Sequence, residues 1–289
     1  MLKGFVYSNL FVALVLSGLS LSSYAQFDQL ALHWYVPVSV FLGSFVLYAF
    51  HRLYKIDFIP MHQLAERHQW VLAHAIPMKY AMSFAVFILM LILPNFDADT
   101  IVWLVPAGIV SIGYTIPIIP YQKGWRRFRD IPLTKPMIIA LVVSYLTLAF
   151  PHFEQLGVRS LFEPVFLHAF VERFLFLLAV TLPFDMRDIR NDKDSGIQTL
   201  GTHFGFENAR IVGYWVLLAW VGSIVMRYVI FGAESVFLVA AACMLLYLLI
   251  AYWRLRVAWA DMKYTMVFEG AIVLYALSYA FSFVFQTVA

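Results

Sequence analysis

Long apolar stretches fill most of this chain, and short polar segments separate them. Apolar runs of about 18 residues or more are typical of helices that cross a lipid bilayer, whereas a surface helix alternates apolar and polar faces. The pattern therefore predicts nine membrane-spanning helices. Their approximate ranges are 5–26, 33–53, 75–94, 100–119, 136–151, 164–184, 209–231, 235–258 and 265–287.

The predicted span at 136–151 is the shortest of these ranges, which suggests a helix that is tilted or shielded by its neighbours. Prolines lie near several predicted ends, where a missing backbone donor costs least. Neither a low-complexity linker nor a second polar region interrupts the series. The expected architecture is thus a single all-α transmembrane domain over residues 1–289.

Composition narrows the class of protein further. Of the 289 residues, 63% are hydrophobic and only 13% are charged, and the mean hydropathy is +0.81, which excludes an ordinary soluble domain. The net charge of +3 comes from basic residues spread between the spans, so it does not indicate a nucleic-acid partner. A lone cysteine, Cys243, excludes a disulfide framework and a cysteine-rich metal site.

Basic residues fall mostly on one side of the predicted membrane. The connections on the side of the N-terminus carry 17 of the 20 lysines and arginines. Positively charged loops stay in the cytoplasm. The bias predicts an integral protein of the cell inner membrane, with its N-terminus in the cytoplasm and its C-terminus outside.

The first span has a competing interpretation. Residues 1–26 contain a lysine, an apolar stretch and the sequence Ser23-Tyr24-Ala25, which resembles a signal-peptide cleavage site. The apolar stretch is long for a signal peptide, which favours a retained helix. Cleavage would leave eight spans with the same charge bias.

The sixth predicted span ends in an acidic segment that carries Asp185, Asp188 and Asp192. At 100° per residue, Asp188 lies 300° from Asp185 and Asp192 lies 340° from it, so the three carboxylates share one helix face. Gly196 is placed to end the helix. Arg187 and its basic neighbours are expected to point elsewhere.

Three carboxylates gathered at a membrane surface need a counter-charge. Mg²⁺ suits such oxygen ligands and commonly bridges carboxylates to substrate phosphates, which points to a diphosphate site. The simpler alternative is a solvated helix end with local ion pairs, which needs no function.

The pattern Asp185-x-x-Asp188-x-x-x-Asp192, followed by Gly196-Ile197-Gln198-Thr199-Leu200, resembles the second aspartate motif of the UbiA-type intramembrane prenyltransferases. The resemblance implies a UbiA-like bundle of nine helices. It implies transfer of a polyprenyl group from an isoprenoid diphosphate to a lipophilic acceptor, often aromatic. In this family, Mg²⁺ held between two aspartate motifs assists the ionisation of the diphosphate.

Residue roles follow from the same resemblance. Asp185, Asp188 and Asp192 would be the catalytic residues that bind Mg²⁺. The fourth connection also resembles that of the family, although the spacing from its tyrosine to its first lysine is longer than usual. The residues expected there to hold the diphosphate are Tyr114, Lys123, Arg126 and Arg127.

The first aspartate motif of the family is largely missing. Around the end of the second span, residues 48–57 contain only one acidic residue, Asp57. We expect Arg52 or Lys55 to replace one cation by binding the diphosphate or the aspartates, because a guanidinium matches phosphate geometry. The alternative is that both side chains only reach the membrane interface. The polar segment after them, residues 61–74, suggests a surface helix that covers the site.

Polar residues inside the spans leave other functions open. His168, Glu172 and Arg173 fall within the sixth span, where charges are costly, so an internal pair is expected. Asn9 and Ser17 could face an acceptor pocket or serve helix packing. The alternatives to the enzyme are a non-catalytic relative that binds isoprenoids or scaffolds other proteins, and a transporter that uses the intramembrane charges.

Overall fold

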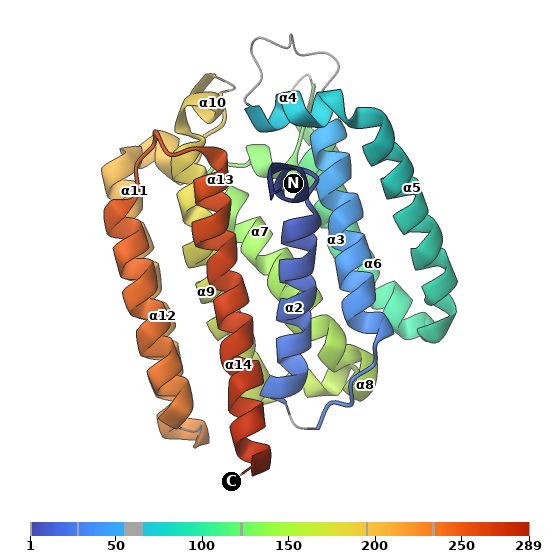
Figure 1. The fold of residues 1–289 in the computed structure, drawn as a ribbon, viewed down its shortest axis with the longest axis vertical. Coiled ribbons are helices and arrows are strands. Elements are labelled where there is room, and N and C mark those ends of the chain that lie inside the picture. Colours follow the sequence, from blue (N-terminus) through green and yellow to red (C-terminus); the bar gives the residue numbers. More distant parts are fainter. Residues whose placement is uncertain are drawn as a thin grey trace.

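Long helices run side by side through the molecule, and their ends gather at two opposite faces (Figure 1). The computed structural model describes residues 2–27, 29–54, 66–121, 124–194, 196–232 and 235–288. Within these residues, six helices are long and apolar enough to cross a membrane, and two shorter apolar helices accompany them. The protein is an all-α membrane protein, as predicted; the count of nine spans stays a prediction.

The bundle is built from helices of 6 to 32 residues that follow one another along the chain. They are α1 (Leu2–Tyr7), α2 (Leu10–Gln26), α3 (Tyr35–Leu53), α5 (Ala75–Ile92), α6 (Ala98–Thr115), α7 (Lys135–Ser144), α8 (Phe150–Ser160), α9 (Pro164–Arg187), α11 (Leu200–Phe231), α12 (Ser235–Arg254) and α14 (Gly270–Val288). Short 3₁₀ or π segments extend some of them, namely η3 (Leu93–Asn95), η5 (Tyr145–Ala149) and η6 (Thr265–Glu269).

Small elements cap one end of the bundle, which we call the motif end because the acidic segment lies there (Figure 1). They are α4 (Glu66–Ala73), α10 (Ile189–Asp194), α13 (Asp261–Tyr264), η4 (Phe128–Asp130), and a hairpin of strands β1 (Ile119–Tyr121) and β2 (Gly124–Arg126), paired antiparallel with Pro120 opposite Trp125. The surface helix expected within residues 61–74 is present as α4; residues 61–65 lie outside the described part.

Helix α9 occupies the centre of the core. It packs against α7 and α11, and its Phe176 stacks on Tyr275 of α14 with ring centroids 4.1 Å apart. Helix α2 packs between α3 and α14 and contributes buried side chains such as Leu19. Cleavage after residue 26, as the signal-peptide alternative requires, would remove α2 and expose the core surfaces of α3 and α14.

The predicted length of the span at 136–151 is wrong. The helical segment runs from Lys135 to Ser160 over 26 residues, with a kink at Gly157. The π-helical segment η5 precedes Pro151, whose missing N–H leaves the Thr147 carbonyl without its helical donor. That carbonyl accepts hydrogen bonds from Ser23 Oγ at 2.5 Å and from Arg173 at 2.8 Å, so the helix passes the proline instead of ending there.

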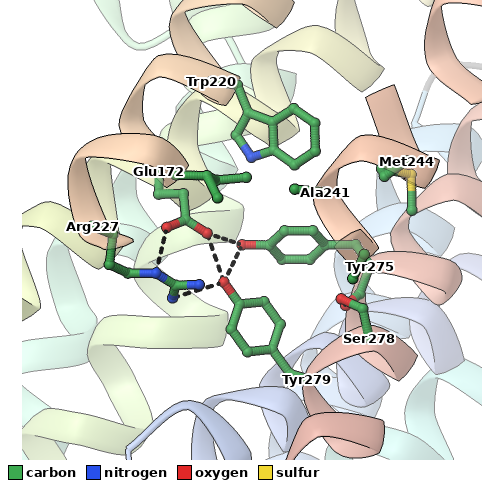
Figure 2. A pocket seen from close by; sticks show the side chains of 10 residues that line it. Glu172, Trp220, Arg227, Ala241, Met244, Tyr275, Ser278 and Tyr279 are labelled. Carbon is green, nitrogen blue, oxygen red and sulfur yellow. Dashed lines mark hydrogen bonds and ion pairs between the residues drawn. The ribbon is translucent and has the colours of Figure 1, made fainter. Parts of the chain in front are cut away.

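The charged residues of α9 do not pair with one another, contrary to the expectation. Glu172 and Arg173 are both fully buried, but consecutive helical side chains point about 100° apart. Figure 2 shows the Glu172 carboxylate among Arg227, Tyr275 and Tyr279, with its Oε2 3.3 Å from Arg227 Nε and its Oε1 2.6 Å from the Tyr279 hydroxyl. Arg173 turns to α2.

Candidate functional site

Three carboxylates converge at the motif end, as their spacing predicts, and a lysine lies among them. Lys135 Nζ is 2.7 Å from Asp192, 3.5 Å from Asp188 and 3.6 Å from Asp185. Asp185 and Asp192 are buried and Asp188 is a quarter exposed. An ammonium group from α7 thus partly neutralises the acidic segment of α9 and α10.

The prediction assumed that the acidic segment is one continuous helix, but the structure breaks it in two. Helix α9 ends at Arg187, Asp188 leaves the helical conformation, and α10 begins at Ile189. Gly196, with φ +69°, follows α10, and Ile197 N donates to Asp192 O at 2.8 Å. This arrangement is the glycine-ended helix stop that the position of Gly196 predicts. The break turns Asp188 and Asp192 toward Lys135 together with Asp185.

The start of α11 supports the deepest carboxylate. Thr199 caps the helix by accepting a hydrogen bond from Thr202 N, and its own N–H donates to Thr202 Oγ1. Gly201 N lies 3.4 Å from Asp185 Oδ2. The backbone is non-helical at Gly205, so the first turn of α11, with its free N–H groups, is the part that favours the ionised form of this aspartate.

A Gly201→Ala substitution should disturb this support. A Cβ at this position would meet Ile189 Cγ1 at 2.5 Å and the Asp185 carbonyl at 3.1 Å, which forces α11 away from α9. We expect a destabilisation of about 1–3 kcal/mol, typical of overpacking. Thermal unfolding in detergent measures it, with Gly222→Ala, where a Cβ meets nothing within 4 Å, as the control. Equal melting temperatures for the two variants would contradict the close contact.

Arg187 was expected to point away from the site, and this expectation is wrong. Its Nε and Nη2 donate to Asp188 Oδ1 and Oδ2 at 2.7 and 3.2 Å, and its Nη1 lies 3.5 Å from Asp261 Oδ1. Burial favours the neutral form of Asp188, but Arg187 and Lys135 outweigh it and lower the pKa of this carboxyl below its ordinary value. Asp188 is therefore ionised at neutral pH.

The residues predicted from the fourth connection fall in two places. The Tyr114 ring lies 5.6 Å from that of His51, and Lys135 and Asp188 are among the charged groups that act on its hydroxyl. Arg126 stacks on Tyr121, and Arg127 forms an ion pair with Asp130 at 2.8 Å. Both arginines line a separate polar cavity of about 440 Å³. Lys123 lies outside the described residues.

The end of α3, where the first aspartate motif would be expected, carries basic groups. His51 bridges Thr115 and Arg129, at 3.0 and 3.3 Å. Arg52 does not contact the aspartates; its Nε donates to Asn9 Oδ1 at 2.9 Å. Lys55 and Asp57 lie outside the described residues. Of the contacts expected for Arg52, the one with the acidic segment is not formed, because Asn9 holds the guanidinium instead; binding of the diphosphate by Arg52 stays a prediction.

Sequence reasoning missed Lys135, which it counted only as a cytoplasmic charge. One signal could have revealed it. The N-terminus of a helix carries a partial positive charge and favours acidic residues, so a lysine at the first position of α7 is unfavourable there. A basic residue in that position needs nearby anions to offset the cost. Ser17, the other polar residue noted on the first span, donates to Pro37 O at 2.8 Å and serves helix packing.

Known structures share the arrangement of these helices. A UbiA homolog from Archaeoglobus fulgidus bound to GPP and Mg²⁺ superposes with a TM-score of 0.66 at 15% identity, covering 98% of this chain and 99% of the other. The same homolog bound to DMAPP and Mg²⁺ gives 0.64 at 16% identity, with the same coverage. The chain has the UbiA fold. A homolog from Aeropyrum pernix K1, without ligand, gives 0.65 at 9% identity and covers 96% and 98% of the two chains.

The UbiA fold was thus recognisable by its shape and not by overall sequence similarity. No protein-family model matches the sequence, and no curated protein matches it at a significant level. The acidic segment at the end of α9 was the observation that led to this fold from the residues. At identities of 9–16%, the likeness establishes the architecture, while the chemistry has to be argued from the side chains.

Proposed function

We propose that this protein is a UbiA-type prenyltransferase that moves a polyprenyl group from an isoprenoid diphosphate to a lipophilic acceptor. The convergence of Asp185, Asp188 and Asp192 at one end of a UbiA-fold bundle carries the proposal. The ligands of the Archaeoglobus fulgidus homolog, GPP and DMAPP with Mg²⁺, support the same substrate class.

The donor set fits one hard cation. Three carboxylates face Lys135 and Arg187, which leaves one negative charge uncompensated among these five groups, and Asp185 Oδ1 is buried without a hydrogen-bond partner. As the side chains lie, the described residues contain no group of three acidic, histidine or cysteine side chains close enough to coordinate a metal. Lys135 has to move off the carboxylates before Mg²⁺ can take its place.

The chain's own groups then have distinct tasks. Asp185, Asp188 and Asp192 would hold Mg²⁺, which neutralises the leaving diphosphate. Lys135, displaced from the carboxylates, lies next to the same point and can pair with diphosphate oxygens. Tyr114 lies on the same side and can orient the head of the donor. Cleavage of the allylic carbon–oxygen bond frees diphosphate, and the acceptor forms the new bond and loses a proton.

Radiolabelled geranyl, farnesyl and geranylgeranyl diphosphates test the proposal with protein purified in detergent. We expect Mg²⁺-dependent release of diphosphate that falls roughly 100-fold or more in Asp188→Asn, the size of effect seen when one electrostatic group is removed from an active site. Asp194→Asn, on the exposed side of α10, is the matched control and should keep wild-type activity. Binding without release for every chain length would contradict the enzyme.

A second candidate function is an isoprenoid-binding relative without activity. The basic end of α3 favours it, because His51 and Arg52 stand where a second group of carboxylates would bind metal. This candidate predicts saturable binding of isoprenoid diphosphates and no turnover in the assay above.

A further inference from the structure

Two arginines from different helices meet at a single buried amide near the motif end. Asn9 Oδ1 accepts from Arg52 Nε at 2.9 Å and from Arg67 at 3.1 Å. Asn9 is fully buried and Arg67 is 4% exposed. Two guanidinium groups that share one neutral acceptor repel each other, and the carboxylates that act on both of them are Glu269 and Asp261.

Two of the N–H donors around Asn9 have no hydrogen-bond partner. Asn9 Nδ2 and Arg67 Nε are buried donors without a partner. Within the described part of the chain, Glu269 and Asp261 act on both guanidinium groups, but neither carboxylate lies within ion-pair distance of them. Buried donors are mostly satisfied in folded proteins, and an unsatisfied one calls for an explanation such as a bound ion or water. Three donor groups, the two guanidinium groups and the Asn9 amide, therefore lie together at a place that suits an anion with several oxygens.

The backbone holds this arrangement in place. Asn9 has φ +70°, a left-handed conformation that separates α1 from α2 and that asparagine adopts more readily than most residues. Helix α4 is fixed over it by Glu66, which pairs with Lys3 of α1 at 2.5 Å and accepts from Tyr7 at 3.3 Å. These contacts place α4, and with it Arg67, beside Asn9 in the absence of a ligand.

The two arginines are electrostatically linked to the acidic segment through Arg187. Arg187, whose Nε is 2.7 Å from Asp188, is among the charged groups that act on both Arg52 and Arg67. Burial lowers the pKa of the Arg67 guanidinium, with Glu269 opposing this effect. Even so, an arginine keeps its proton at neutral pH.

We propose that Arg52, Arg67 and Asn9 form an anion site that binds the diphosphate of the isoprenoid donor without a metal ion. This inference rests on the proposed function, and it assigns to the two arginines the role that a second Mg²⁺ would need carboxylates on α3 to fill. A planar guanidinium binds phosphate oxygens through two parallel hydrogen bonds, so a pair of them can hold one phosphate of the head.

Isothermal titration of purified protein with inorganic diphosphate and with geranyl diphosphate, in EDTA and in Mg²⁺, tests the site. Wild type should bind both probes in EDTA. Arg52→Gln combined with Arg67→Gln should weaken this metal-free binding roughly 100-fold, since each charged hydrogen bond contributes about tenfold or more. Arg254→Gln, an exposed arginine near the same membrane face, is the control and should match wild type.

Asn9→Asp provides a variant that should fold. Aspartate tolerates the left-handed conformation and has nearly the same shape, and its carboxylate would satisfy both guanidinium groups from within. We expect at least tenfold weaker diphosphate binding in EDTA with an equal or higher melting temperature. A purely structural network predicts unchanged binding in this variant, and that result would overturn the proposal.

The remaining outcomes separate the inference from the function on which it rests. Wild-type binding that requires Mg²⁺ would overturn the anion site and leave the prenyltransferase intact. Inorganic diphosphate binding as tightly as geranyl diphosphate would uphold the anion site and count against an isoprenoid donor. Displacement of diphosphate by short-chain phosphatidylglycerol at equal affinity would reassign the site to a lipid headgroup and overturn the proposal.

Discussion

An Arg173→Met variant is expected to unfold in detergent at markedly lower temperature than wild type, with a loss of about 2–4 kcal/mol. The guanidinium is fully buried and reaches five acceptors. They are the Leu19 and Thr147 carbonyls, Ser22 Oγ, Ser23 Oγ and Gln26 Oε1. Methionine fills much of the same space but donates nothing, so these acceptors lose their partner where no water replaces it.

Two further variants separate hydrogen bonding from charge. Arg173→Lys keeps the charge but offers three donors on one nitrogen, so we expect an intermediate loss. Ser22→Ala removes one acceptor at 3.1 Å and should cost less than about 1 kcal/mol. Thermal unfolding followed by circular dichroism compares all three. A Met variant as stable as wild type would show that the contacts between α2, η5 and α9 do not need the guanidinium.

Lys135→Met should destabilise the protein in EDTA by about 3–5 kcal/mol, because removing one partner leaves buried charges uncompensated. Asp185, Asp188 and Asp192 would then face one another with only Arg187 beside Asp188. The loss should be largely reversed by Mg²⁺, which can occupy the place of the ammonium group. Melting temperatures measured with EDTA and with increasing Mg²⁺ give both effects.

The matched control is Lys193→Met, an exposed lysine on α10. It should change stability by less than about 0.5 kcal/mol and show no response to Mg²⁺ beyond that of wild type. If Lys135→Met is destabilised but Mg²⁺ does not restore it, the carboxylates do not hold a divalent cation in this protein. The result would then remove the metal from the proposed function while leaving the ammonium in its structural role.

Both the fold class and the convergence of the three aspartates could be predicted from the sequence. Apolar runs longer than a soluble helix needs leave only a membrane bundle, since backbone groups in lipid must be satisfied within helices. The i, i+3 and i+7 spacing of Asp185, Asp188 and Asp192 is local information, and it survived even the break of the helix at Asp188.

What the sequence could not determine is which distant residues meet the local motifs. Lys135 lies 57 residues from Asp192, and Asn9 lies 43 and 58 residues from its two arginines. No periodicity links such positions, because their contact depends on how whole helices pack. The same holds for Glu172 and Arg173, adjacent in the chain but bound to different helices. Local spacing fixed the acidic face of the site, and tertiary packing alone decided which cations would lie opposite it.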